Sequence, residues 1–129
     1  MAKHTIGGLS SEGLPYSRAV RAGDFIYVSG MLGFGPDGAI VSGGVAAETR
    51  QILGDLQDLL AEAGCGLGDV VKVNVCLPNA EDFDAFNAAY AEFFASEPPA
   101  RATICAGLTI DARIEIEAIV YDPQPRREA

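Results

Sequence analysis

The stretch VAAETRQILGDLQDLLAEAGCGLGDVVKVNVCL, residues 45–77, contains both kinds of regular structure that decide the fold. From residue 45 to 63 the apolar side chains recur at helical spacing, which predicts an amphipathic helix that Gly64 is well placed to end. Residues 70–77 are rich in β-branched side chains and predict a largely buried strand. The apolar stripe of the helix comprises Val45, Ile52, Leu53, Leu56, Leu59, Leu60 and Ala63, and its polar face comprises Glu48, Gln51, Asp55, Asp58 and Glu62.

A hairpin is predicted before this helix. Residues 17–20 and 25–29 favour strands, and residues 21–24 (RAGD) supply the turn between them. The glycines of residues 33–38 (GFGPDG) predict a second turn, followed by a short extended piece around Ile40.

A second helix and two more strands are predicted after residue 77. Asn79 is a candidate N-cap for a helix that runs to about Ala95 and stops before Pro98 and Pro99. Residues 102–108 and 113–121 indicate strands, and the short connection between them predicts an antiparallel hairpin. The acidic first turn of the helix contains Glu81, Asp82 and Asp84, and its buried face contains Phe83, Phe86, Tyr90 and Phe93 or Phe94.

The order of these elements predicts an α+β fold, a mixed β-sheet with two helices packed on one face. We expect one domain over residues 1–129, with a core at about 14–121 and loose ends at 1–9 and 122–129. The other face of the sheet is then uncovered. Since the mean hydropathy is +0.19, we expect that face to pack against copies of the chain in a closed symmetric oligomer.

Composition excludes several classes of function. A chain of 129 residues with a formal net charge of −9 repels polyphosphate, so nucleic acid and anionic membranes are poor candidate partners. Three scattered cysteines and one histidine, His4, cannot form a structural zinc site, and they favour a reducing compartment. The longest uncharged run, residues 25–36, is too short for a membrane helix, and the N-terminus does not resemble a signal peptide. We therefore expect a cytoplasmic protein.

Two charged positions are candidates for chemistry. Glu115 and Glu117 alternate along one strand and so share a face. They form either a solvated strand surface or a general base that orients water in an oligomer cleft. Arg101 is either an ordinary surface arginine or a guanidinium fork that holds a substrate carboxylate.

Three uncharged polar residues are weaker candidates. Tyr16 and Ser29 lie at strand ends, where a hydroxyl could reach a ligand or serve only a turn. Asn87 lies on the apolar face of the second helix and needs a partner, which a backbone group could also be. We interpret Cys76 and Cys105 as inert core residues.

Several short motifs occur in an order that resembles the RidA family (reactive intermediate deaminase, also called YjgF), over about residues 14–121. They are Pro15-Tyr16-Ser17, GDFIYVSG at residues 23–30, Asn87, Pro99-Ala100-Arg101, and IEIEAI at residues 114–119. The resemblance implies a chorismate-mutase-like α+β fold, a homotrimer and three ligand clefts between subunits.

The resemblance also implies an activity: hydrolysis of reactive enamines and imines such as 2-aminoacrylate and 2-iminopropanoate to 2-oxo acids and ammonia, a form of metabolite damage control. By position, Arg101 would hold the substrate carboxylate and Glu115 would orient the attacking water. Neither metal nor cofactor is implied, since an iminium carbon is already electrophilic. The cleft would be lined or supported by Tyr16, Ser29 and Asn87, and Gly30 and Thr103 would contribute backbone donors.

The chain departs from the family pattern at Thr103, where cysteine is frequent, at Met31, where glutamine is frequent, and at Arg18. The segment between Arg101 and Glu115 is also one residue shorter than in the best-known members. These changes lie at the rim of the implied cleft and would favour larger imines, 3-aminoacrylate or an aminomuconate-like enamine. A non-catalytic small-acid-binding or chaperone-like trimer is the alternative, and the charge of −9 argues against a third reading, an endoribonuclease.

Overall fold

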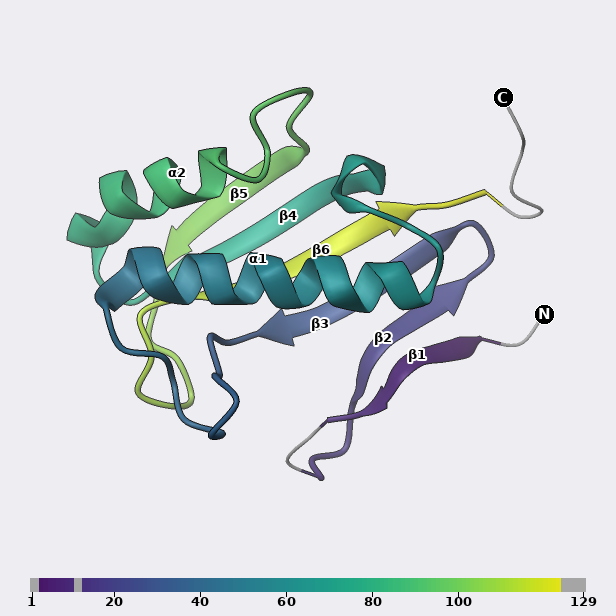
Figure 1. Cartoon of the computed structure of the whole chain (residues 1–129), viewed down its shortest axis with the longest axis horizontal. Coiled ribbons are helices and arrows are strands. Elements are labelled where there is room, and N and C mark those ends of the chain that lie inside the picture. Colours follow the sequence, from purple (N-terminus) through teal and green to yellow (C-terminus); the bar gives the residue numbers. More distant parts are fainter. Residues whose placement is uncertain (1–2, 11–12, 124–129) are drawn as a thin grey trace.

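A computed structural model describes residues 3–10 and 13–123, which form one six-stranded sheet with two helices on one face (Figure 1). The sheet order is β1-β2-β3-β6-β4-β5, and neighbouring strands are antiparallel except for the parallel pair β4 and β5. The strands are β1 (His4–Leu9), β2 (Ser17–Ala22), β3 (Phe25–Met31), β4 (Val70–Leu77), β5 (Ala100–Cys105) and β6 (Glu115–Tyr121). The helices are α1 (Gly44–Glu62) and α2 (Phe83–Ala91), with short 3₁₀ turns η1 (Leu67–Asp69) and η2 (Ala80–Asp82).

The core lies between the helices and the sheet. The predicted stripe of α1 is buried, apart from Ala63 at the helix end, which is only partly buried. Gly64 has a positive φ of 76° directly after the helix, as its predicted terminating role requires. The apolar residues of the sheet that meet this stripe alternate along the strands and include Ile26, Val28, Val73, Val75, Ile116, Ala118 and Val120.

The second helix differs from its prediction at both ends. It ends at Ala91 and not near Ala95, and Phe83 in its first turn is 44% exposed. Asn79 precedes a 3₁₀ turn, but its side chain makes no capping hydrogen bond. Phe86, Tyr90 and Phe94 are buried as expected.

The predicted hairpin of the last two strands is wrong. Strand β4 lies between β5 and β6, so the two do not pair. The long connection through α2 makes β4 and β5 a parallel crossover unit, which places β5 at the sheet edge. The segment 106–114 therefore returns from the edge to the centre of the sheet.

The N-terminal end is more ordered than predicted. Residues 4–9 form β1, which pairs with β2 through a register shift between Ile6 and Leu9. Gly7 and Gly8 have positive φ values at this shift, and the resulting bulge hides the strand from a search for regular alternation. At the other end, buried Asp122 pairs with Arg21 at 2.6 Å, whereas residues 124–129 lie outside the described part of the chain.

The face of the sheet opposite the helices exposes aromatic side chains. Phe25 pairs with Tyr121, and Tyr27 follows on the same face of β3. The rings of Phe25 and Tyr121 lie 5.3 Å apart, and all three residues are exposed, as is Ile104 of β5. The sequence prediction that one sheet face is left uncovered and apolar is thus confirmed in the single chain.

Candidate functional site

A pocket of about 570 Å³ opens where β2 and β3 separate. Their pairing runs from Ala22 and Phe25 only as far as Ala19 and Val28. Beyond that point the Ser29 hydroxyl donates a hydrogen bond of 2.6 Å to the Ser17 carbonyl oxygen, which bridges the diverging strands. The pocket is lined by, among others, Tyr16, Arg18, Ser29, Gly30, Glu115 and Glu117.

Gly30 sets the position of the Glu115 carboxyl group. A Cβ on Gly30 would lie 2.8 Å from Glu115 Cδ and about as close to both carboxyl oxygens. Only a residue without a side chain leaves this space, so the carboxyl group rests directly against the β3 backbone.

The pair Glu115 and Glu117 lies on the uncovered face of β6, as the alternation predicted. Glu115 pairs with Cys76 and Glu117 with Asn74, whose side-chain amide donates to Glu117 Oε1 at 3.1 Å. Burial raises the pKa of Glu115, and the negative charge of Glu117 raises it further. Both effects make the Glu115 carboxyl group a better proton acceptor than an exposed one.

Arg101 lies on the opposite face of the sheet, against α2. Its guanidinium carbon is 4.8 Å from the ring centre of Phe86 and 4.9 Å from that of Tyr90, distances at which a cation is attracted to a ring face. The ion pairs within residues 3–10 and 13–123 use other arginines, so no carboxylate neutralises Arg101 there. The cation is held against the faces of these aromatic rings.

Two further predicted residues accompany Arg101. Thr103 follows it on the same face of β5, and its hydroxyl oxygen is buried with no hydrogen-bond partner in the described ranges. The Tyr90 hydroxyl is also buried, beside Arg101; burial raises the pKa of Tyr90, and the charge and hydrogen bonding of Arg101 oppose that rise. Asn87 lies half-buried on α2, one turn before Tyr90.

A single chain therefore separates the predicted site residues into two groups. The carboxylate half-site comprises Tyr16, Ser29, Gly30 and Glu115, and the arginine half-site comprises Asn87, Arg101 and Thr103. Arg101 shares the face of its strand partner Val73, which is fully buried beneath the helices, whereas Glu115 faces the other way. Their positions on one sheet prevent them from meeting within one subunit.

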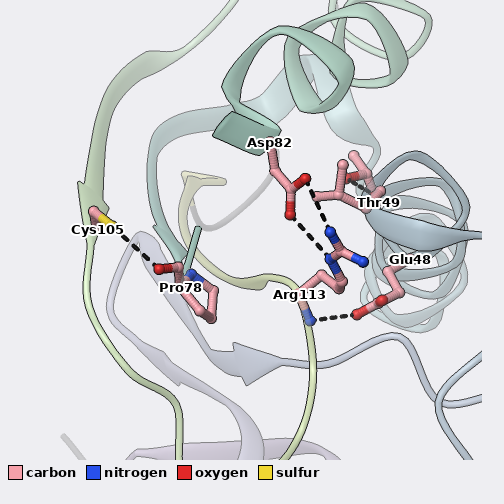
Figure 2. Close-up of polar contacts among 7 residues, drawn as sticks. Glu48, Thr49, Pro78, Asp82, Cys105 and Arg113 are labelled. Atoms are coloured by element: carbon pink, nitrogen blue, oxygen red, sulfur yellow. Dashed lines mark hydrogen bonds and ion pairs between the residues drawn. The ribbon is translucent and has the colours of Figure 1, made fainter. Parts of the chain in front are cut away.

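A polar clamp that sequence analysis missed positions the start of β6 (Figure 2). The backbone N–H of Arg113 donates to Glu48 Oε1 at 2.8 Å, and its guanidinium donates to both oxygens of Asp82, at 3.0 and 3.3 Å. Arg113 precedes Glu115 by two residues, so the clamp ties the entry of this strand to α1 and η2. We define the polar clamp as Glu48, Asp82 and Arg113.

Glu48 was assigned to the solvent face of its helix, which is wrong, because only 3% of it is exposed. The spacing contained a signal: Glu48 follows Val45 by three residues and precedes Ile52 by four, which places it on the apolar stripe. Gly33 packs closely on it, since a Cβ there would lie 3.0 Å from Glu48 Cα.

We expected Cys76 and Cys105 to be core residues, but the structure places both outside the core. Cys105 is exposed and its thiol donates to the Pro78 carbonyl oxygen at 3.3 Å (Figure 2), and Cys76 is half-buried and donates to that of Ala106. Each thiol thus forms a hydrogen bond between a strand and a neighbouring loop.

Residues 3–10 and 13–123 bring together no group of three or more His, Cys, Asp and Glu residues able to hold a metal ion. None of the helices in these ranges has the length and apolarity to cross a membrane.

Comparison with known proteins identifies the family. Residues 10–122 match the family model described as endoribonuclease L-PSP, which is the YjgF/RidA family. The chain belongs to this family. The resemblance found in the sequence motifs is thereby confirmed.

Individual members are similar over most of their length. A human protein named 2-iminobutanoate/2-iminopropanoate deaminase is 45% identical over 107 residues, which cover 81% of this chain and 78% of the human one. A RutC family protein of Pyrococcus horikoshii is 42% identical over 109 residues, covering 83% and 86%. The crystal structure of RidA from an Antarctic Psychrobacter superposes with a TM-score of 0.79 at 32% identity, covering 91% of this chain and 93% of that one.

We predict that Glu117→Gln lowers the pKa of Glu115 toward its ordinary value, because it removes the negative charge of the next side chain on the same face of β6. An NMR titration of the side-chain carboxyl carbons measures this directly. Glu81→Gln, an exposed change in η2, serves as the control and should leave the pKa of Glu115 unchanged. A Glu115 pKa that stays in place in Glu117→Gln would contradict the coupling.

We also predict a pH-dependent stabilisation by Glu48→Gln. Burial raises the pKa of Glu48 above its ordinary 4.5, although the hydrogen bond and charge of Arg113 oppose the rise. An acid with a raised pKa binds more protons in the folded chain than in the unfolded one, so its contribution to stability falls as pH rises through that window. Glutamine keeps an acceptor for the Arg113 N–H without the charge.

Urea unfolding between about pH 4 and pH 8 measures this effect. The free energy of unfolding of Glu48→Gln minus that of the wild type should grow with pH. The same difference for Glu62→Gln, an exposed change at the end of α1, should stay flat. A pH-independent difference for Glu48→Gln rules out the buried charge as its cause.

Proposed function

We propose that this protein is a deaminase that hydrolyses 2-imino and 2-enamino acids, of the 2-iminopropanoate and 2-aminoacrylate type, to 2-oxo acids and ammonia. The observation that carries the proposal is that the site residues lie in two separate half-sites. Arg101, which has no acidic partner within residues 3–10 and 13–123, and Glu115, whose pKa is raised, lie on opposite faces of one sheet, Arg101 against the rings of α2 and Glu115 on the uncovered face. The name of the human relative supports the same reaction.

We propose further that a second copy of the chain brings the two half-sites together. The exposed aromatic face of β3 and β6 would be buried between copies, which places the carboxylate half-site of one subunit at the boundary with the next. Arg101 lies on the edge strand β5, where a neighbouring subunit can reach it. A closed trimer would contain three such clefts.

The chemistry in such a cleft follows from the two groups. The Arg101 guanidinium would hold the substrate carboxylate through two parallel hydrogen bonds. Glu115 would accept a proton from water as that water attacks the imine carbon, and the carbon–nitrogen double bond becomes a single bond. The same carboxyl group would then give this proton to the amine nitrogen and transfer the proton of the new hydroxyl group to the same nitrogen, which leaves as ammonia while the carbon–oxygen double bond forms. An enamino acid would first take up a proton at carbon and so become the imine.

A non-catalytic small-acid-binding trimer is the second candidate, and the unpaired Arg101 favours it equally. Only turnover separates the two functions. The endoribonuclease named in the family description is disfavoured by the net charge of −9, because RNA binding depends on cations that neutralise phosphates.

The first test measures how well the protein competes with a chemical trap for the imine. D-amino-acid oxidase converts D-alanine to 2-iminopropanoate, semicarbazide traps the imine, and the wild-type protein should suppress the trapped product. Arg101→Ala should lower this activity by about a hundredfold, because the substrate carboxylate loses the guanidinium group that is proposed to hold it. Arg50→Ala is the control, since that exposed arginine pairs with Glu92 away from the pocket. Full activity in Arg101→Ala refutes the proposed anchor.

The second test addresses the shared cleft by mixing two inactive variants. Arg101→Ala retains Glu115 and Glu115→Gln retains Arg101, so a mixed trimer would contain one intact cleft. Random assembly from equal amounts should restore about a quarter of wild-type activity. Each variant alone gives the baseline, and light scattering should give about three times the 13.5 kDa of one chain. Monomeric protein, or mixed trimers without recovered activity, would contradict the arrangement.

A further inference from the structure

Arg18 is a second arginine that forms no ion pair within residues 3–10 and 13–123. Among the described ranges, ion pairs account for the arginines at 21, 50 and 113, which leaves Arg18 and Arg101. Acidic residues outnumber basic ones by 18 to 9 in this chain, so an unpaired arginine is unusual. Arg101 contacts aromatic rings of α2 and has a role in the proposed mechanism, whereas Arg18 has no such ring contact in the described ranges and no such role.

The surroundings of Arg18 place its guanidinium group at the pocket. Arg18 lines the same cavity as Glu115 and is half-buried. Its Nη1 atom lies 3.5 Å from the position that a Cβ on Gly7 would occupy, a position that Leu59 Cδ1 approaches to 2.6 Å. The group thus lies against β1, and several of its five N–H donors have no partner in the described chain.

Three acidic residues also line the pocket, and each of them has contacts other than Arg18. Both carboxyl oxygens of Asp55 accept from the Gln51 side-chain amide at 3.1 Å, and Glu117 accepts from Asn74. Glu115 lies against Gly30. None of the three comes within 4.0 Å of Arg18 as an ion pair. Arg18 is therefore the cation of this pocket in the described residues.

The size of the cavity exceeds what a three-carbon substrate needs. 2-Iminopropanoate has six non-hydrogen atoms, whereas the pocket has a volume of about 570 Å³. Ligand pockets of this size accommodate considerably larger molecules. Even if a neighbouring subunit fills part of the space, a longer substrate side chain has room to extend toward Arg18.

We propose that Arg18 binds a second acidic group at the far end of the ligand, which makes imino or enamino dicarboxylic acids the preferred substrate class. The first carboxylate would bind Arg101 of the neighbouring subunit, and the distal one would bind Arg18. This inference rests on the proposed function for its reaction and for the Arg101 end of the site, whereas the Arg18 end lies in the pocket of the single chain.

Matched ligands of equal chain length isolate the distal group. D-aspartate oxidase produces 2-iminoglutarate from D-glutamate, and D-amino-acid oxidase produces 2-iminopentanoate from D-norvaline. For Arg18→Gln, we expect kcat/KM for 2-iminoglutarate to fall about tenfold or more relative to 2-iminopentanoate, as loss of a hydrogen-bonded charge pair requires. Arg18→Lys should recover part of the preference, and Arg50→Gln, with the same change of net charge, should keep it.

A binding measurement separates this inference from the proposed function. Calorimetry of the stable products should show that wild type binds 2-oxoglutarate more tightly than 2-oxopentanoate and that Arg18→Gln removes the difference. If the protein hydrolyses neither imine, the proposed function fails, and the calorimetry alone decides the role of Arg18. If both imines are hydrolysed and Arg18→Gln leaves their ratio unchanged, the deaminase stands and the role of Arg18 is refuted.

Discussion

The central position of strand β6 is the constraint on which the rest of this structure depends. Its alternation directs Ile116, Ala118 and Val120 into the core, and directs Glu115 and Glu117 to the opposite face. Neighbours on both sides, β3 and β4, hold this register. A slip of one residue would bury both carboxyl groups and expose the apolar ones, so the hydrophobic core and the candidate site are specified together.

The parallel crossover from β4 through α2 to β5 determines the position of Arg101. It places Arg101 beneath the rings of α2, on the helix side of the same sheet. The proposed reaction, which uses Arg101 together with Glu115, would therefore need two subunits, since these two residues lie on opposite faces of one sheet. The exposed aromatic residues on the uncovered face supply an apolar surface for such association.

Local backbone irregularities shape the pocket more than regular structure does. The strands β2 and β3 separate beyond Ala19, a register shift interrupts β3 before Met31, and Gly30 leaves the space that the Glu115 carboxyl group occupies. The polar clamp then ties the strand entry to α1 and η2 through the buried carboxyl groups of Glu48 and Asp82. Burial raises the pKa of Glu48 as it does that of Glu115, so the same desolvation acts on a structural and on a candidate catalytic carboxyl group.

The features that depend on neighbouring residues could be predicted from the amino-acid sequence. Helical spacing predicted α1, alternation placed Glu115 and Glu117 on one face, and short motifs identified the family. Tertiary structure decided what depends on distant pairing: the position of β5, the burial of Glu48, the strand within residues 4–9 and the separation of Arg101 from Glu115. The physical reason is that periodicity reports which side of an element is apolar, whereas the choice of neighbouring strand is made by contacts between segments far apart in the chain.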